Sequence, residues 1–120
     1  MARVQLTDDA KDDIRGLDGS VRTRVLKDLK KLEVSPSQRG DPLGSRNSGN
    51  LTGLRKLYVG PNKGYRAVFA AEGDDLAVVM VVAARADAEC YEMAVARLTL
   101  MSDQNQQSEM VGLLRSIMGH

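Results

Sequence analysis

Hydrophobic and polar positions alternate in two different ways along the chain. Near the N-terminus, Val4 and Leu6 alternate with polar residues, which predicts a short β-strand. The segments after Thr7 and after Ser20 instead carry apolar residues at three- and four-residue steps, which predicts two amphipathic helices. Thr7 and Ser20 are suitable N-caps for these helices, and Ser35-Pro36 ends the second one.

The middle of the chain changes to strand-like spacing. Residues 36–50 are rich in Ser, Gly, Asn and Pro, which predicts a long loop. Residues 54–59 and 65–71 then alternate, and residues 60–64 between them predict a hairpin turn. After a second turn, the continuous apolar run 76–84, with four valines, predicts a central strand that is buried on both faces.

The last third of the chain is expected to be helical. Asp87 is suited to cap a helix that runs to about Leu98, and residues 102–118 begin polar and continue as an amphipathic stripe. The order β-α-α-β-β-β-α predicts an α+β fold with a small, mainly antiparallel sheet, plus an extra C-terminal helix. We therefore expect one domain over residues 1–98 and a helical extension over residues 99–120.

Composition limits the classes of protein that need to be considered. The 120 residues are 42% hydrophobic, which is enough for one domain with a real core. The chain has 17 Lys and Arg and 16 Asp and Glu, which gives a net charge of +1. Nucleic-acid binding would therefore require a local basic patch. Cys90 is the single cysteine, which excludes an intrachain disulfide and indicates a reducing compartment. The N-terminus lacks the apolar run of a signal peptide and no run could cross a bilayer, so we expect a cytoplasmic location.

Five polar residues stand out around the predicted strands. Lys56 and Tyr58 share one face of their strand, Arg66 opens the next strand, Arg85 closes the valine strand, and Tyr91 lies in the first turns of the following helix. Each alone has an ordinary explanation as a solvated side chain or a core aromatic. Together, cations near a tyrosine favour an anion site and proton transfer by the phenol. One Cys and one His give no metal-ligand cluster, so no metal or cofactor is expected.

The order of these residues resembles the RelE family of bacterial type II toxin–antitoxin toxins, within the RelE/ParE superfamily. The resemblance covers about residues 3–98. It rests on Arg85 and on the runs Val4-Gln5-Leu6-Thr7, Gly40-Asp41-Pro42-Leu43, Leu51-Thr52-Gly53-Leu54-Arg55-Lys56-Leu57, Gly64-Tyr65-Arg66-Ala67-Val68-Phe69 and Glu89-Cys90-Tyr91-Glu92-Met93-Ala94-Val95-Ala96-Arg97-Leu98.

The resemblance implies a metal-independent endoribonuclease, or mRNA interferase, that enters the ribosomal A site and inhibits translation. The 2′-hydroxyl of the mRNA attacks the adjacent phosphate and leaves a 2′,3′-cyclic phosphate and a 5′-hydroxyl. Tyr91 matches the tyrosine that transfers a proton, and Arg85 matches the arginine that supports the leaving group. Arg66 matches the arginine that stabilises the transition state.

The same resemblance implies RNA-binding residues and partners. Lys56 matches one member of the family's basic pair, whereas Tyr58 stands where a second cation is expected, so Arg55 or Lys63 would have to substitute. The implied partners are the ribosome, mRNA and a cognate antitoxin protein. An extended antitoxin segment would wrap around the domain, and a homodimer or a toxin–antitoxin heterotetramer is the expected assembly.

Two other functions remain open at this point. ParE-type relatives inhibit DNA gyrase without nuclease activity, but they generally lack the pair formed by Arg85 and Tyr91, which favours the nuclease. A catalytically weak, antitoxin-binding relative is the other alternative. The near-neutral charge and Tyr58 favour it, because fewer cations mean weaker docking on RNA.

Overall fold

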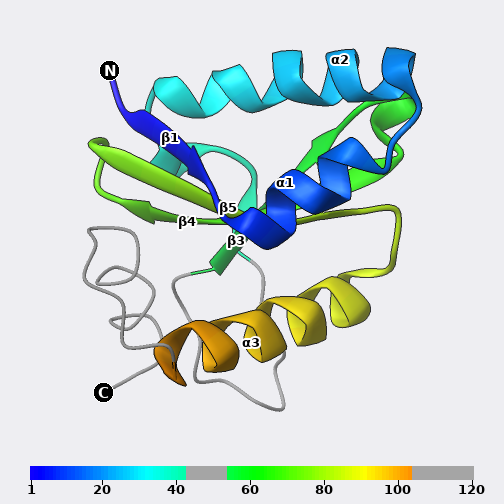
Figure 1. Cartoon of the computed structure of the whole chain (residues 1–120). Helices are drawn as coiled ribbons and strands as arrows, with labels where there is room; N and C mark the ends of the chain where they lie inside the picture. The colour runs from blue at the N-terminus through cyan, green and yellow to red at the C-terminus, as the bar shows by residue number, and fades with distance from the viewer. Residues whose placement is uncertain (43–53, 104–120) are drawn as a thin grey trace.

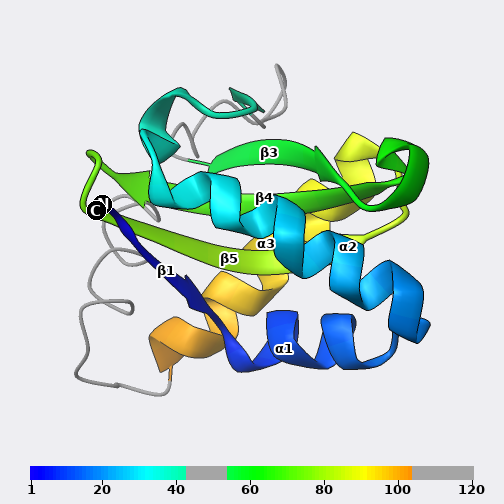
Figure 2. The same cartoon turned by 90° about the horizontal axis from the view of Figure 1, so that it is seen from above.

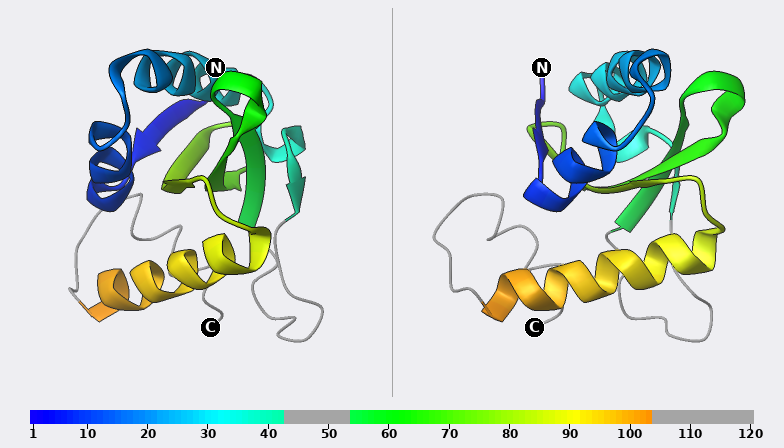
Figure 3. Two further views of the ribbon diagram at one scale, coloured as in Figure 1. Left: turned by 90° about the vertical axis from the view of Figure 1, so that its right-hand side faces the viewer. Right: turned by 45° about the vertical axis from the view of Figure 1, so that its right-hand side comes forward.

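The computed structural model describes residues 1–42 and 54–103, which form an α+β fold. A sheet of the order β1-β5-β4-β3-β2 lies between α1 and α2 on one face and α3 on the other (Figures 1 and 3). The elements are β1 Arg3–Leu6, α1 Asp8–Arg15, α2 Gly19–Leu29, 3-10 helix η1 Lys30–Glu33, η2 Pro36–Gln38, β2 Asp41–Pro42, β3 Leu54–Val59, η3 Pro61–Lys63, β4 Tyr65–Glu72, β5 Leu76–Ala83 and α3 Asp87–Asp103. The predicted fold class is confirmed.

Strand β5 is the buried central strand that its valines predict. It pairs with β1 in parallel and with β4 in antiparallel, and all but its last residue are buried. Alternating side chains divide the core into two layers, one on each face of the sheet. The layer under α3 contains Leu54, Val68, Ala70, Leu76, Val78, Met80, Val81, Cys90, Ala94 and Leu98. The layer under α1 and α2 contains Ala10, Ile14, Val25, Leu29, Leu32, Val59, Ala67, Phe69, Ala77, Val79 and Val82.

An ion pair closes the edge of β5 beyond the end of β1. The β4–β5 register shifts so that Met80 is an extra residue, a β-bulge that changes which backbone groups face outward. Asp13 accepts a hydrogen bond from the Val82 amide at 2.9 Å, and Arg97 donates to the Met80 carbonyl at 2.7 Å. Arg97 also binds both carboxylate oxygens of Asp13, at 2.8 and 3.1 Å. The pair therefore joins α1, β5 and α3.

The helix starts follow the sequence only in part. The Thr7 hydroxyl accepts a hydrogen bond from the Ala10 amide at 3.1 Å, so the predicted N-cap of α1 is confirmed. Ser20 is not the N-cap of α2, because the helix begins at Gly19 and Asp18 takes the cap position. The Ser20 hydroxyl donates to the Asp18 carboxylate instead. In Figure 2, which is seen from above, α2 lies in front of the sheet and α3 lies behind it.

Two segments differ from their predicted structure. The segment expected to be a loop contains η2 and the short strand β2, which pairs with Arg55 and Lys56 of β3. Gly40, with φ of +63°, permits this approach, because a Cβ there would lie 1.9 Å from the Lys56 carbonyl oxygen. Helix α3 was expected to end at about Leu98 but continues to Asp103. The division into a domain over residues 1–98 and an extension over residues 99–120 stays a prediction. Residues 43–53 and the helix expected in the C-terminal tail beyond 103 lie outside the described residues.

We predict that Asp13→Ala lowers the free energy of unfolding by about 3 kcal/mol, because Arg97 stays largely buried and loses the carboxylate that binds it most closely. The second acid near Arg97, Asp9, is more distant, with its carboxylate 4.0 Å from the guanidinium. Asp12→Ala is the matched control, since Asp12 pairs with Arg15 on the exposed side of the same helix and should change stability by about 0.5 kcal/mol or less. Urea unfolding followed by circular dichroism measures both. Equal losses in the two variants would contradict the role assigned to Asp13.

Candidate functional site

Antiparallel pairing of β3 and β4 brings two cations and a tyrosine together on the face of the sheet that α3 covers. Leu57 and Val59 point into the opposite core layer, so the alternating Lys56 and Tyr58 face α3. Tyr58 is directly opposite Arg66 in the ladder. The Lys56 Nζ lies 5.4 Å and the Arg66 Cζ lies 5.2 Å from the centroid of the Tyr58 ring, which places both charges at cation–π distance.

A carboxylate from the next element completes this cluster. Asp87, the first residue of α3, accepts a hydrogen bond from the Lys56 ammonium through Oδ2 and one from Arg66 Nε at 2.5 Å through Oδ1. Asp87 was expected to cap the helix, and this expectation is wrong: it lies inside the first turn and its carboxylate binds two strand cations. We call Lys56, Tyr58, Arg66 and Asp87 the cation cluster.

The electrostatics of the cation cluster follow from this contact. The hydrogen bond from Lys56 lowers the pKa of Asp87 against the opposing effect of its partial burial, and Arg66 lowers it further. The same bond raises the pKa of Lys56. The Asp87 side chain is 42% exposed, compared with 13% for Lys56 and 25% for Arg66. Solvent therefore reaches the acid more readily than the two cations that it binds.

Arg85 differs from its prediction. It does not close the buried strand, because β5 ends at Ala83 and Arg85 lies two residues further on, with an exposed side chain. Its Nη1 is 3.1 Å from a carboxylate oxygen of Glu89. Its carbonyl accepts a hydrogen bond from Arg66 at 2.5 Å. The backbone of Arg85 thus joins the cation cluster, while its guanidinium belongs to a separate surface pair.

Tyr91 lies in the first turns of α3, as predicted. It is one helical turn after Asp87, so both residues lie on the stripe of α3 that faces the sheet. Tyr91 is half-buried and packs against the core layer under α3. Its neighbour Cys90 is fully buried, which raises the pKa of the thiol. The fold therefore brings Tyr91 to the same helix face as the acid that binds Lys56 and Arg66.

The structure does not bring the two substitute cations into this cluster. Arg55 projects to the opposite face of β3 and donates to the carbonyls of Arg39 and Gly40, at 2.8 and 3.0 Å. Its guanidinium thus fastens the segment before β2. Lys63 is exposed in the hairpin turn, beyond the paired residues of β3 and β4. Sequence reasoning missed Asp87 as an ionic partner and Tyr58 as the ring beneath both cations.

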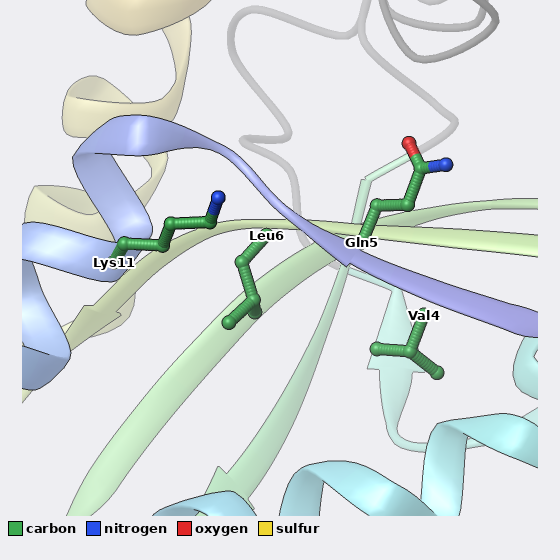
Figure 4. Close-up of a pocket in the computed structure, with 4 residues that line it drawn as sticks. All are labelled: Val4, Gln5, Leu6 and Lys11. Carbon is green, nitrogen blue, oxygen red and sulfur yellow. The ribbon is translucent and has the colours of Figure 1, made fainter.

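Three pockets are lined by residues other than those of the cation cluster. Figure 4 shows one that is lined by three β1 residues, Val4, Gln5 and Leu6, and by Lys11 of α1. Another lies on the outer side of α3 and includes Arg85 and Glu89. The cation cluster is thus a surface feature of the sheet and of the first turn of α3. A long substrate could lie across such a surface.

Comparison of the sequence with protein-family models and with curated proteins gives no match. Within residues 1–42 and 54–103, no three His, Cys, Asp or Glu side chains are grouped so that they could hold a metal ion. In the same part of the chain, no helix combines the length and the apolar character that a membrane span needs.

We predict that Asp87→Asn destabilises the fold at neutral pH and that this deficit shrinks on acidification. The folded-state pKa of Asp87 is lowered, so its ionised carboxylate stabilises fully above the ordinary value and loses this effect as the pH falls through the lowered pKa. Urea unfolding at several pH values between about 6 and 2.5 measures the difference. Glu92→Gln, an exposed acid of the same helix, is the control, and a deficit that is independent of pH would contradict the assignment.

Proposed function

We propose that this protein is a RelE-type toxin, a metal-independent endoribonuclease that cuts mRNA in the ribosomal A site. The observation that carries the proposal is the convergence of Lys56 and Arg66 over Tyr58, beside the helix face that presents Tyr91. Cations beside a phenol supply charge for a phosphate and a group that can transfer a proton. This is the chemistry that 2′-hydroxyl attack on an mRNA phosphate requires.

Each residue has a role in the proposed reaction. Lys56 and Arg66 bind the scissile phosphate and offset the charge that builds up on its oxygens. Tyr91 takes the proton of the 2′-hydroxyl. The 2′-oxygen then forms the new bond to phosphorus while the bond to the 5′-oxygen breaks, and the leaving 5′-oxygen takes up a proton from water. The products are a 2′,3′-cyclic phosphate and a 5′-hydroxyl.

Arg85 takes part only after it leaves Glu89. The Arg85–Glu89 pair is exposed, with both side chains more than half accessible, and an exposed pair of this kind contributes little free energy. A ribosome-bound phosphate is therefore a strong competitor for this guanidinium.

The proposal includes a cytoplasmic location, a cognate antitoxin as partner and rRNA as a docking surface.

Primer extension on mRNA in a purified bacterial translation system tests the proposal. We expect codon-phased cuts whose rate falls about 100-fold or more in Tyr91→Phe, because the variant loses the proton-transfer group. Arg85→Ala should slow cutting as well. Tyr65→Phe is the matched control, since Tyr65 packs in the opposite core layer and the same hydroxyl is removed. Unchanged cutting in Tyr91→Phe would remove this residue from the mechanism.

A specific observation favours a second candidate, the catalytically weak relative that binds an antitoxin. Asp87 forms ion pairs with Lys56 and Arg66, and Glu89 forms one with Arg85. Each residue that is expected to bind phosphate is therefore already paired with an acid.

Overexpression in cells without an antitoxin separates the two candidates. The nuclease arrests growth, and Tyr91→Phe relieves the arrest. Normal growth with folded wild-type protein supports the weak relative instead. Growth arrest that persists in Tyr91→Phe, together with inhibited DNA supercoiling by gyrase, would contradict both candidates.

A further inference from the structure

The position where Lys56 and Arg66 would bind a phosphate already holds an anion from the chain itself. The Asp87 carboxylate uses one oxygen for each cation, as two oxygens of a phosphate would. The two cations lie on neighbouring strands, and Asp87 reaches them from the start of α3. In the free protein the acid thus takes the place that the proposed function assigns to the substrate.

The exposure of the three side chains shows which way an incoming anion must approach. Lys56 and Arg66 are mostly covered, by Asp87 and by the Tyr58 ring among others, whereas Asp87 is the most exposed of the three charges. An anion that arrives from solvent meets a like charge before it reaches the cations. It binds both only if the Asp87 carboxylate moves away.

The geometry points to Asp87 as a resident competitor for the phosphate of the substrate. Its carboxylate holds the Lys56–Arg66 pair in the free protein, and an RNA phosphodiester must displace it to bind. This inference rests on the proposed function for the identity of the ligand, but the exchange of one anion for another is a property of the cation cluster alone. The contact weakens phosphate binding by the free protein, and it breaks when the ribosome holds an RNA phosphate against the two cations.

Charge in the cation cluster sets the size of the expected effect. Lys56 and Arg66 carry one positive charge each and Asp87 carries one negative charge, so Asp87→Asn removes the only acid in the cluster as we define it. Removal of one like charge a few ångströms from a bound anion, at a partly exposed site, strengthens binding about tenfold.

An NMR titration of the full chain with inorganic phosphate measures this effect. We expect Asp87→Asn to bind phosphate about tenfold more tightly than the wild type, with the largest shifts at the backbone amides of Lys56 and Arg66. Glu92→Gln removes the same charge from an exposed position of the same helix, outside the cluster, and should bind like the wild type. Lys56→Gln, added to Asp87→Asn, should abolish the gain. If Asp87→Asn does not melt cooperatively, Asp87→Ser replaces it.

Two results would overturn the inference. Equal tightening in Asp87→Asn and Glu92→Gln would show that overall charge alone sets phosphate affinity. Unchanged or weaker binding in Asp87→Asn would show that Asp87 positions the cations instead of competing for them. A gain that survives Lys56→Gln would also contradict it, because the bound phosphate would then lie elsewhere.

The cleavage assay keeps this inference separate from the proposed function. If Asp87→Asn binds phosphate more tightly but neither it nor the wild type cuts mRNA, the competitor role stands and the nuclease function fails. If the wild type cuts mRNA and Asp87→Asn shows no gain in phosphate binding, the nuclease stands and the competitor role fails.

Discussion

Strand β5 must satisfy every backbone group along its length, because it is buried and cannot exchange hydrogen bonds with water. Strand β4 pairs with one edge of β5 along its length, but β1 pairs with the other edge only as far as Val79. Beyond that point the bulge at Met80 turns a carbonyl and the Val82 amide outward, and Asp13 and Arg97 bind them. The requirement to pair one buried strand therefore fixes α1 and α3 against the sheet.

This constraint positions the candidate site. Helix α3 is held in its third turn by Arg97 and in its first turn by Asp87, so its axis is set at two points. The attachment through Arg97 is structural, since Arg97 is mostly buried and Asp13 raises its pKa. The attachment through Asp87 is more exposed and contacts Lys56 and Arg66. The buried contact of Arg97 thus holds the helix in place, while its first turn carries the more exposed ionic contacts.

Much of this arrangement could be predicted from the sequence. The valine run predicted β5, the alternation at residues 54–59 and 65–71 predicted β3 and β4, and the turn between them predicted the hairpin. Counting back from that turn would also have paired Tyr58 with Arg66, so the cation–π contacts had a signal in the sequence. The shared sheet face of Lys56 and Tyr58 follows from strand alternation alone.

The remainder depended on contacts between distant segments. The local sequence pattern at Asp87 predicts a helix cap. Only the packing of α3 on β4 and β5 brings its carboxylate to Lys56 and Arg66. Arg55 reads as a cation available for RNA, but β2 supplies carbonyls that bind it on the other face. Arg85 appeared to end a buried strand because the end of β5 depends on its pairing with β4.

We propose that Lys56 and Arg66 form the phosphate site of a nuclease. A crystal structure of the full chain with tungstate, a heavy analogue of phosphate, tests it most directly. We predict the anion between the Lys56 ammonium and the Arg66 guanidinium, with the Asp87 carboxylate turned away from both. Tungstate bound elsewhere, with Asp87 still bridging the two cations, would contradict it.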